Sequence, residues 1–287
     1  MVKKKTNLAL YALIGYPLGH SFSPAMQNAG FAARNIAAQY CTVPVPPGKI
    51  KTFVAALPHL PFAGYNVTVP YKEVVMPALD RCAEEVEVIG AVNTIVREKR
   101  VLTGHNTDWR GFVDSLRVDL SFSPRGKAAV ILGAGGAGKA CLYGLCKAGV
   151  THVTIADTDY AKACRLKEKI TVYFPDISFA VISPQAVAQK KFLRSFDLLV
   201  NTTPCGMRST DPQLIPLRCL AGLRVRVYDV IYNPKETTLI KTARRAGLHC
   251  SNGLGMLLYQ GTRAFECWTG EKAPVAAMKK ALYAQAG

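Results

Sequence analysis

The glycine-rich run GAGGAG at positions 133–138 constrains the fold more than any other feature of this chain. An apolar stretch that ends in Ile131-Leu132 precedes it, and an alanine-rich segment follows it. Glycines let a backbone approach a pyrophosphate closely, and the N-terminus of a helix supplies N–H donors and a favourable dipole. The order strand, glycine loop, helix therefore predicts a βαβ unit that binds a dinucleotide.

Asp157 lies 19 residues after Gly138, at the end of the next predicted strand, THVTIAD. A carboxylate at this place can accept hydrogen bonds from an adenosine ribose, and it would repel a 2′-phosphate. The next residue, Thr158, offers no cation, so we expect NAD as the cofactor, with NADP still possible. Lys162 and Arg165 could offset the repulsion in part, but a solvated helix face explains both residues more simply.

Strand-like and helix-like segments alternate along the whole chain, which predicts an α/β protein. In the N-terminal part, strands are expected in LALYALIG, AQYCTVPV, AGYNVTV and AVNTIV, with helices near 24–36, 48–57 and 71–89. A second βαβ series begins at Gly126, and helical spacing returns in GLGMLLYQGTRAFECWTG. The layout predicts two α/β domains with a boundary near 109–125.

Composition supports a folded protein without a membrane span. Of the 287 residues, 49% are hydrophobic, which excludes a disordered chain. The longest uncharged apolar stretch, 128–138, is rich in glycine and ends at Lys139, so it is too short to cross a bilayer. The start, MVKKKTNLALYALIG, resembles a signal peptide but lacks a small-residue cleavage site, and we expect a cytoplasmic protein.

The net charge of +17 raises the question of nucleic-acid binding. Residues 1–110 hold 12 Lys+Arg against 7 Asp+Glu, and residues 111–287 hold 24 against 12, so the excess is spread over the chain. Attraction of small anions explains such a surface as well as DNA does, and no nucleic-acid partner is expected. The nine cysteines include no CxxC pair, which predicts reduced, buried thiols and no metal site.

Polar residues gather where hydrophobic segments of the first 110 residues end, which is where open α/β sheets place ligands. They are Ser21 and Ser23, Asn66, Thr68 and Lys72, Asn93, and Asn106 with Asp108. Singly, each has an ordinary explanation: Ser23-Pro24 and Asp108 could cap helices, and Asn93 could stabilise a turn. Together they suit a small ligand that carries several hydroxyls and an acid group.

With these motifs the sequence resembles the shikimate dehydrogenase family, which includes quinate/shikimate dehydrogenases. The resemblance runs from about residue 10 to 287 and is carried, in family order, by SFSPAMQN, NVTVPYKE, GAVNTI, GHNTDWRG, GAGGAGKA, NTTPCGM, YDVIYNPKETTLI and GLGMLLYQGTRAFECWTG. It implies an N-terminal α/β substrate domain with a mixed, mostly parallel sheet, a Rossmann-type dinucleotide-binding domain, and a cleft between them. The implied domains are 1–110 with 253–287, and 111–252.

The resemblance also implies roles for single residues. Lys72 matches the catalytic lysine and Asp108 its paired aspartate, while Ser21 and Ser23 match the hydroxyls that hold the substrate carboxylate. The residues expected around the substrate ring hydroxyls are Asn66, Thr68, Asn93, Tyr232 and Gln260. The residues expected to hold the cofactor are Gly133, Gly135, Gly136, Ala137, Asp157, Thr158, Val230 and Gly253.

Two departures from the family pattern bear on specificity. Members that use NADP carry Asn-Arg-Thr where this chain has Asp157-Thr158-Asp159, which is similar to the NAD-dependent quinate/shikimate branch. Gln27 also replaces a histidine that is common in biosynthetic members. Ser23 is retained, whereas some quinate-preferring members have threonine there, so shikimate stays an expected substrate.

The expected reaction interconverts shikimate and 3-dehydroshikimate by hydride transfer, and quinate and 3-dehydroquinate are the alternative pair. Lys72 is expected as the acid/base, at the start of the predicted helix 71–89, where the dipole would favour the neutral amine by about half a kcal/mol. A quinate-preferring enzyme, an enzyme for an amino-substituted analogue and a non-catalytic metabolite sensor stay open. The sequence is compatible with a role in the biosynthesis of aromatic amino acids and with a role in quinate catabolism. It is also compatible with a monomer and with a homodimer.

Overall fold

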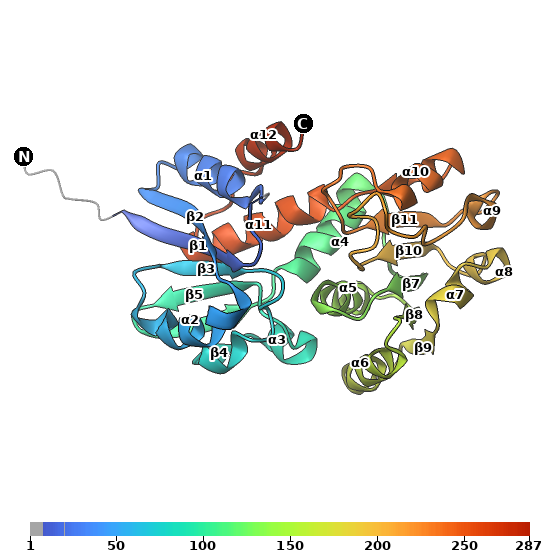
Figure 1. The fold of residues 1–287 in the computed structure, drawn as a ribbon, viewed down its shortest axis with the longest axis horizontal. Coiled ribbons are helices and arrows are strands. Elements are labelled where there is room, and N and C mark those ends of the chain that lie inside the picture. The colour runs from blue at the N-terminus through green and yellow to red at the C-terminus, as the bar shows by residue number, and fades with distance from the viewer. Residues whose placement is uncertain (1–7, 20) are drawn as a thin grey trace, which may run out of the picture. The chain divides into compact units, whose positions relative to one another are not determined.

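The computed structural model describes residues 8–19 and 21–287 and contains two compact units (Figure 1). The first unit comprises the described residues up to Thr107 together with Leu258–Gly287, and the second unit comprises Asp108–Leu257. These divisions fall three residues before the boundary predicted at 110 and five residues after the one predicted at 252. The lysine-rich start, residues 1–7, and His20, which precedes Ser21, lie outside the described residues.

The first unit is built on a mixed six-stranded sheet with the order β2-β1-β3-β5-β6-β4. Strand β1 pairs in parallel with β2 and β3, whereas β5 is antiparallel to both β3 and β6. The strands are β1 (Ala9–Gly15), β2 (Ala38–Pro44), β3 (Gly64–Val67), β4 (Arg81–Cys82), β5 (Thr94–Glu98) and β6 (Val101–His105). The expected strands are confirmed, and β4 and β6 are additional.

Helices cover both faces of this sheet because side chains alternate along β1. On one face Tyr11 stacks on Phe31 of α1 (Ser23–Ala33) and contacts Trp268 of α11 (Leu254–Thr269). On the other face Ala12 and Ile14 join a core with Ile50 of α2 (Ile50–Ala56). The remaining helices of this unit are η1 (Pro47–Lys49), η2 (Leu57–His59), η3 (Met76–Ala78), α3 (Glu84–Ile89) and α12 (Val275–Gln285).

The predicted helix over 71–89 is wrong. A turn carries Lys72, and η3, β4 and α3 follow in succession. Pro77 has no N–H for a continuing helix. Pairing with β6 also competes for the backbone: Asp80 N–H donates to Leu102 O at 3.0 Å and Ala83 N–H to Gly104 O at 2.9 Å. No α-helix begins at Lys72, so the dipole argument for this lysine fails.

The second unit holds an all-parallel sheet with the order β12-β11-β10-β7-β8-β9. In chain order within the unit this is the doubly wound Rossmann arrangement, which reverses direction between β7 and β10. The strands are β7 (Ala128–Leu132), β8 (His152–Ala156), β9 (Ser178–Ile182), β10 (Leu198–Asn201), β11 (Arg226–Asp229) and β12 (Cys250–Ser251). The predicted Rossmann-type unit is therefore confirmed.

Helix α5 (Gly136–Lys147) follows the glycine loop directly and is buried along most of its length. Helix α4 (Asp108–Asp119) packs against it across Gly144, in the segment expected to form a domain boundary. The other helices are α6 (Tyr160–Tyr173), α7 (Pro184–Val187), α8 (Lys190–Leu193), α9 (Leu217–Leu220) and α10 (Thr238–Arg245). Val130, Leu199 and Val227 form a core with the last four of these helices.

Within the described residues, no helix is long and apolar enough to span a membrane, and no group of metal-binding side chains occurs. All nine cysteines are free. Cys141, Cys146 and Cys219 are buried, five others are half-buried, and Cys267 is exposed, so the expectation of buried thiols is wrong for Cys267.

Candidate active site

Three of the predicted substrate residues lie in one buried hydrogen-bond network of the first unit. Asn66, at the end of β3, donates from Nδ2 to Asn93 O and to Thr94 Oγ1, each at 3.0 Å. Its Oδ1 accepts from the Tyr40 hydroxyl at 2.8 Å. These contacts fix which way the amide of Asn66 points.

Asn93 is the centre of the network. Its Oδ1 accepts from the Thr107 backbone N–H at 2.7 Å, and its Nδ2 donates to Thr107 Oγ1 at 2.9 Å and to Gln260 Oε1 at 3.4 Å. Asn66, Asn93 and Gln260 are 6%, 3% and 9% exposed. A network of this kind holds amide donors and acceptors in set directions, which suits recognition of a polyhydroxylated ligand.

Tyr40, Thr94 and Thr107 were not predicted as part of the site. Tyr40 and Thr94 sit in segments with strong strand patterns, where aromatic and β-branched residues are typical. Thr107 lies between the two residues that the GHNTDWRG motif did single out. The pairing of β5 with β6, which brings Thr94 opposite His105, is what places these hydroxyls together.

Thr68 and Lys72 follow β3 within the same unit. Thr68 N–H donates to Ile14 O at 2.8 Å, and the Thr68 methyl lies so close to Gly15 that a Cβ there would collide with it. The Lys72 carbonyl accepts from Val92 N–H at 2.8 Å, which ties the turn to the residue before Asn93. The Lys72 side chain is half-buried.

Ser21 and Ser23 stand at the start of α1. Ser23 N–H donates to Ser21 Oγ at 3.3 Å, and Ser23 is the first helical residue. The N-cap is Phe22, so the alternative that Ser23 caps the helix is wrong. One turn later Gln27 is fully buried and donates from Nε2 to Gly261 O at 3.0 Å, while its Oε1 has no partner among the described residues.

Asp108 and Tyr232 belong to the second unit. Asp108 is 5% exposed and is the first residue of α4, directly after Thr107 of the network. Tyr232 lies in the segment after β11, is half-buried, and has its pKa raised by burial. Asp108 was expected in the first domain, and the division of the chain between Thr107 and Asp108 assigns it to the other.

The glycine loop has the tight geometry that a dinucleotide site needs. Gly133 has φ of +102°, a conformation that side chains rarely adopt. Gly138 lies against the Gly133 carbonyl, where a Cβ would be 2.9 Å from Gly133 C and from Thr202 Oγ1. Thr202, which was not predicted, donates to Leu132 O at 2.7 Å and to Gly133 O at 3.1 Å and so holds the loop from β10. Gly136 and Ala137 form the first turn of α5.

Asp157 follows β8, as predicted, and its carboxylate contacts the glycine loop. Oδ2 accepts from Ala134 N–H at 2.7 Å, and Oδ1 accepts from Asp159 N–H at 2.9 Å and weakly from Thr158 Oγ1 at 3.5 Å. A carboxylate has about four acceptor sites, so capacity remains for a ribose hydroxyl. The Lys162 ammonium lies 4.0 Å from the Cβ position of Gly135, so it faces this loop and is more than part of a solvated helix face.

Val230 and Gly253 are in contact within the second unit, since a Cβ on Gly253 would collide with the Val230 carbonyl. Beside them Asp229, fully buried, accepts from Asn201 Nδ2 at 3.0 Å, Ile231 N–H at 3.1 Å and Thr237 Oγ1 at 2.6 Å. Burial raises the pKa of Asp229 to about 6, although these hydrogen bonds act in the opposite direction. No separate pattern indicates Asp229, which lies inside the YDVIYNP motif.

Comparison with known proteins places these features in one family. Residues 13–95 match the model of the shikimate dehydrogenase substrate binding domain, and residues 253–283 match that of the shikimate 5'-dehydrogenase C-terminal domain. A protein of Geobacter sp. (strain M21) named shikimate dehydrogenase (NADP(+)) is 39% identical over 273 residues, which cover 95% of this chain and 94% of that protein.

Two solved structures are similar over nearly the full length. Shikimate 5-dehydrogenase from Listeria monocytogenes, in complex with shikimate and NAD, has a TM-score of 0.87 and 32% identity, with 98% of each chain covered. Quinate dehydrogenase from Corynebacterium glutamicum, in complex with NAD, also has a TM-score of 0.87 and 32% identity, over 96% of this chain and 99% of that one. The chain therefore belongs to the shikimate dehydrogenase family of oxidoreductases.

Proposed function

We propose that this protein interconverts shikimate and 3-dehydroshikimate with a nicotinamide cofactor, and that quinate and 3-dehydroquinate are a second substrate pair. The observation that carries the proposal is the buried network of Asn66, Asn93 and Gln260, which ends at Thr107, the residue before Asp108. Its amides suit ring hydroxyls, and both shikimate and quinate carry several of these. The family membership supports the same chemistry.

Lys72 is the proposed acid/base and Asp108 its partner. The residues proposed below for the dinucleotide would hold the nicotinamide cofactor, which would supply the hydride chemistry at C3 of the substrate. An alcohol gives up hydride only as its O–H proton leaves, so a basic nitrogen must receive that proton. In the reverse direction the Lys72 ammonium donates the proton to the forming alcohol. The hydrogen bond from Val92 N–H to the Lys72 carbonyl supports this role, because it ties the backbone of the turn to the residue before Asn93.

Substrate recognition is assigned to two groups of side chains. Ser21 and Ser23 are the proposed ligands of the substrate carboxylate. They are hydrogen-bonded to each other at the start of α1, where Ser23 N–H donates to Ser21 Oγ. The proposed ligands of the ring hydroxyls are Asn66, Thr68, Asn93, Tyr232 and Gln260. A network with fixed amide orientations discriminates between substrates, because a substrate whose hydroxyls do not match the directions of these amides makes fewer hydrogen bonds.

The second unit fits a dinucleotide. Gly133, Gly135, Gly136 and Ala137 would hold the pyrophosphate, with the loop shaped by the positive φ of Gly133. Asp157 and Thr158 would lie at the adenosine ribose, and Val230 and Gly253 at the nicotinamide end. Each role rests on the position of the residue around the loop and on the family motifs.

The choice between NAD and NADP depends on opposing charges near Gly135. The Asp157 carboxylate disfavours a 2′-phosphate, and on this ground we propose NAD as the preferred cofactor. The Geobacter relative is named for NADP(+), and the Lys162 ammonium beside the loop offers a 2′-phosphate a favourable contact, so we also propose that NADP is accepted. A location in the cytoplasm, and a monomer or homodimer, stay predictions.

Initial rates with shikimate and with quinate, each against NAD⁺ and NADP⁺, test the proposal. We expect the largest kcat/KM for shikimate with NAD⁺, with measurable turnover of quinate and of NADP⁺. Faster turnover of quinate would identify a quinate-preferring enzyme, and a higher kcat/KM with NADP⁺ would overturn the role given to Asp157. Binding of shikimate without turnover in any combination would favour the metabolite sensor.

A further inference from the structure

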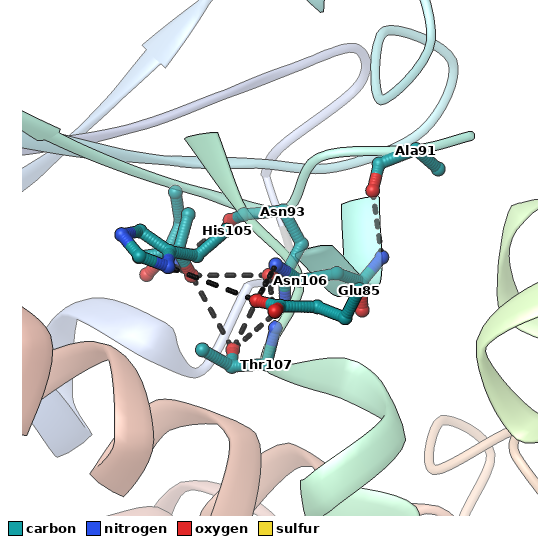
Figure 2. Close-up of polar contacts among 8 residues, drawn as sticks. Glu85, Ala91, Asn93, His105, Asn106 and Thr107 are labelled. Carbon is teal, nitrogen blue, oxygen red and sulfur yellow. Dashed lines mark hydrogen bonds and ion pairs between the residues drawn. The ribbon is translucent and has the colours of Figure 1, made fainter. Parts of the chain in front are cut away.

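A carboxylate on α3 holds the chain segment that leads into Asp108. Glu85 Oε1 accepts from the Asn106 backbone N–H at 3.3 Å and lies 3.7 Å from His105 Nδ1 (Figure 2). The side chains of His105 and Glu85 are 28% and 21% exposed, so both are only partly open to water. Burial acts to raise the pKa of Glu85, but the nearby His105 side chain and the backbone N–H groups of Glu85 and Asn106 outweigh it and hold the pKa below its ordinary value.

The segment that Glu85 contacts is also joined to the loop that carries Asn93. Asn106 Nδ2 donates to Ala91 O at 2.9 Å, Asn93 N–H donates to His105 O at 3.1 Å, and Thr107 N–H donates to Asn93 Oδ1 at 2.7 Å. Figure 2 shows these contacts grouped around Asn93 and Asn106. A shift of the backbone at Asn106 would therefore move Asn93 and the chain entering Asp108 together.

Helix α3 is well placed to fix this arrangement. It ends at Ile89, and the next residue, Gly90, has a φ of +70° that turns the chain into 91–93. Val86 and Ile89 anchor the helix in the core. The Glu85 side chain thus connects α3 to His105 and Asn106. The chain that follows the end of the same helix carries Asn93. The two other carboxylates in its first turn, Glu84 and Glu87, are exposed.

We propose that Glu85 is a positioning residue for the reaction, which acts by holding the backbone at Asn106 and thereby the directions of Asn93 and Asp108. The contacts of its side chain are with His105 and Asn106, and it is given no contact with substrate or cofactor in the proposed site. This inference rests on the proposed function, because its kinetic consequence exists only if Asn93 and Asp108 serve the reaction.

Kinetics of Glu85→Ala and Glu85→Gln in the full-length protein test the proposal. Glu85→Ala should lower kcat/KM for shikimate by about ten- to a hundredfold, since a small misplacement of reacting groups costs up to that factor. The dissociation constant for the cofactor, measured by fluorescence, should be unchanged because the glycine loop belongs to the other unit. Glu85→Gln retains an acceptor oxygen for Asn106 N–H and should recover most of the loss.

Glu84→Ala is the matched control, since it removes an exposed carboxylate from the same helix, and it should behave like the wild type. Amide hydrogen exchange supplies a readout that does not depend on turnover. In Glu85→Ala, exchange at Asn106 and Thr107 should accelerate by about tenfold or more, as expected when a hydrogen bond to a charged group is lost. Exchange in α5 should not change.

Unchanged exchange at Asn106 and Thr107 would overturn the inference, because Glu85 would then not hold the segment. Faster exchange with wild-type kinetics would overturn it as well, because the segment would then not matter for the reaction. A wild-type protein that turns over neither shikimate nor quinate would instead refute the proposed function, and the exchange data would still decide whether Glu85 fixes Asn106. Melting curves of all variants identify a general loss of folding.

Discussion

Lys72 is the residue on which the proposed reaction depends most, because no hydride leaves an alcohol that keeps its proton. We predict that Lys72→Ala lowers kcat by about 10²- to 10⁴-fold, the usual contribution of one acid/base group. The Michaelis constant for shikimate should change little, since the ring hydroxyls and carboxylate are assigned to other side chains. Steady-state kinetics at saturating cofactor measures both constants.

Lys51→Ala is a suitable control for this experiment, since it removes an exposed lysine of α2 and should leave kcat unchanged. A Lys72→Ala variant that retained near wild-type turnover would remove Lys72 from the mechanism. Another base would then have to receive the proton, and the pH–rate profile of the variant would report its pKa.

Asp229 should make the stability of the protein depend on pH. Its pKa is raised to about 6 in the folded chain by burial, compared with an ordinary value near 4. Loss of the Asp229 proton therefore costs more free energy in the folded chain than in the unfolded chain. The stability that Asp229 contributes is complete below about pH 4, where both states are protonated, and is lost as the pH rises through 6. Two pKa units correspond to about 3 kcal/mol.

Asp229→Asn isolates this effect, because asparagine does not titrate. The free energy of unfolding of the wild type minus that of the variant should fall by about 3 kcal/mol between pH 4 and pH 7. Urea denaturation at a series of pH values measures the difference. A difference that does not change with pH would mean that Asp229 has the same pKa in the folded and unfolded chains.

The variant should in addition be less stable by an amount that does not depend on pH, since the new amide cannot accept all three hydrogen bonds that reach the carboxylate.

The sequence identified residues whose side chains are chemically distinctive and stand next to a turn or a proline, such as Lys72 and Ser23. It did not identify Tyr40, Thr94 or Thr107, because their side chains are ordinary for strands and become polar partners only through sheet pairing. Gln27 was noted as a substitution, but its contact with Gly261 joins residues 234 apart in the chain. Local patterns carry no information about such pairs.

At the scale of elements, the strand, loop and helix around Gly133 act as one unit whose packing excludes side chains. We predict that Gly138→Ala raises the Michaelis constant for the cofactor by about tenfold or more, because the new Cβ would meet the Gly133 backbone and Thr202. A backbone obstacle cannot turn aside as a flexible side chain can, so the loop must shift away from the pyrophosphate position. The Michaelis constant for shikimate should change less.

Gly48→Ala serves as the control for this substitution, since a Cβ there meets nothing within 4 Å. Cofactor binding by Gly138→Ala is best measured by isothermal titration as well as by kinetics, because a displaced loop weakens binding before any chemistry occurs. An unchanged dissociation constant would show that the loop tolerates the methyl group and that its close packing is not needed for the cofactor.

Elements were predicted well where hydrophobic period and turn residues agreed, as in β7, α5 and β8. The error over 71–89 has a different origin. Its charged and apolar residues fit a helical period. Backbone hydrogen bonds between residues 80–83 and β6 instead make part of this segment, β4, an edge strand of the sheet. The sequence predicts a boundary where α4 lies, because the second βαβ series begins only at Gly126. Tertiary pairing decides both cases, and periodicity alone does not report it.

At the scale of the whole molecule, helix α11 links the two units, since the division between them falls after Leu257 within this helix. Its later part packs on the first sheet, where Trp268 Nε1 donates to Ile95 O at 3.0 Å and lies against Gly64. The expected return of the C-terminal helices to the first domain is explained by these contacts. Only a family motif could indicate the return in advance, because the contact spans most of the chain.

The net charge of +17 is a property of the whole molecule and should govern how fast its anionic ligands arrive. Both the proposed cofactor and the proposed carboxylate substrate are anions, so we predict that kcat/KM falls severalfold as ionic strength rises from about 0.02 to 0.3 M, where the Debye length shortens to less than about 10 Å. The value of kcat at saturation should be nearly constant, because screening acts on the encounter of ligand and protein and not on buried hydrogen bonds.

The measurement needs initial rates over a salt series, with a second salt to exclude specific ion effects. A flat kcat/KM would mean that the basic residues do not attract these ligands, and another anionic partner would then be needed to explain the charge.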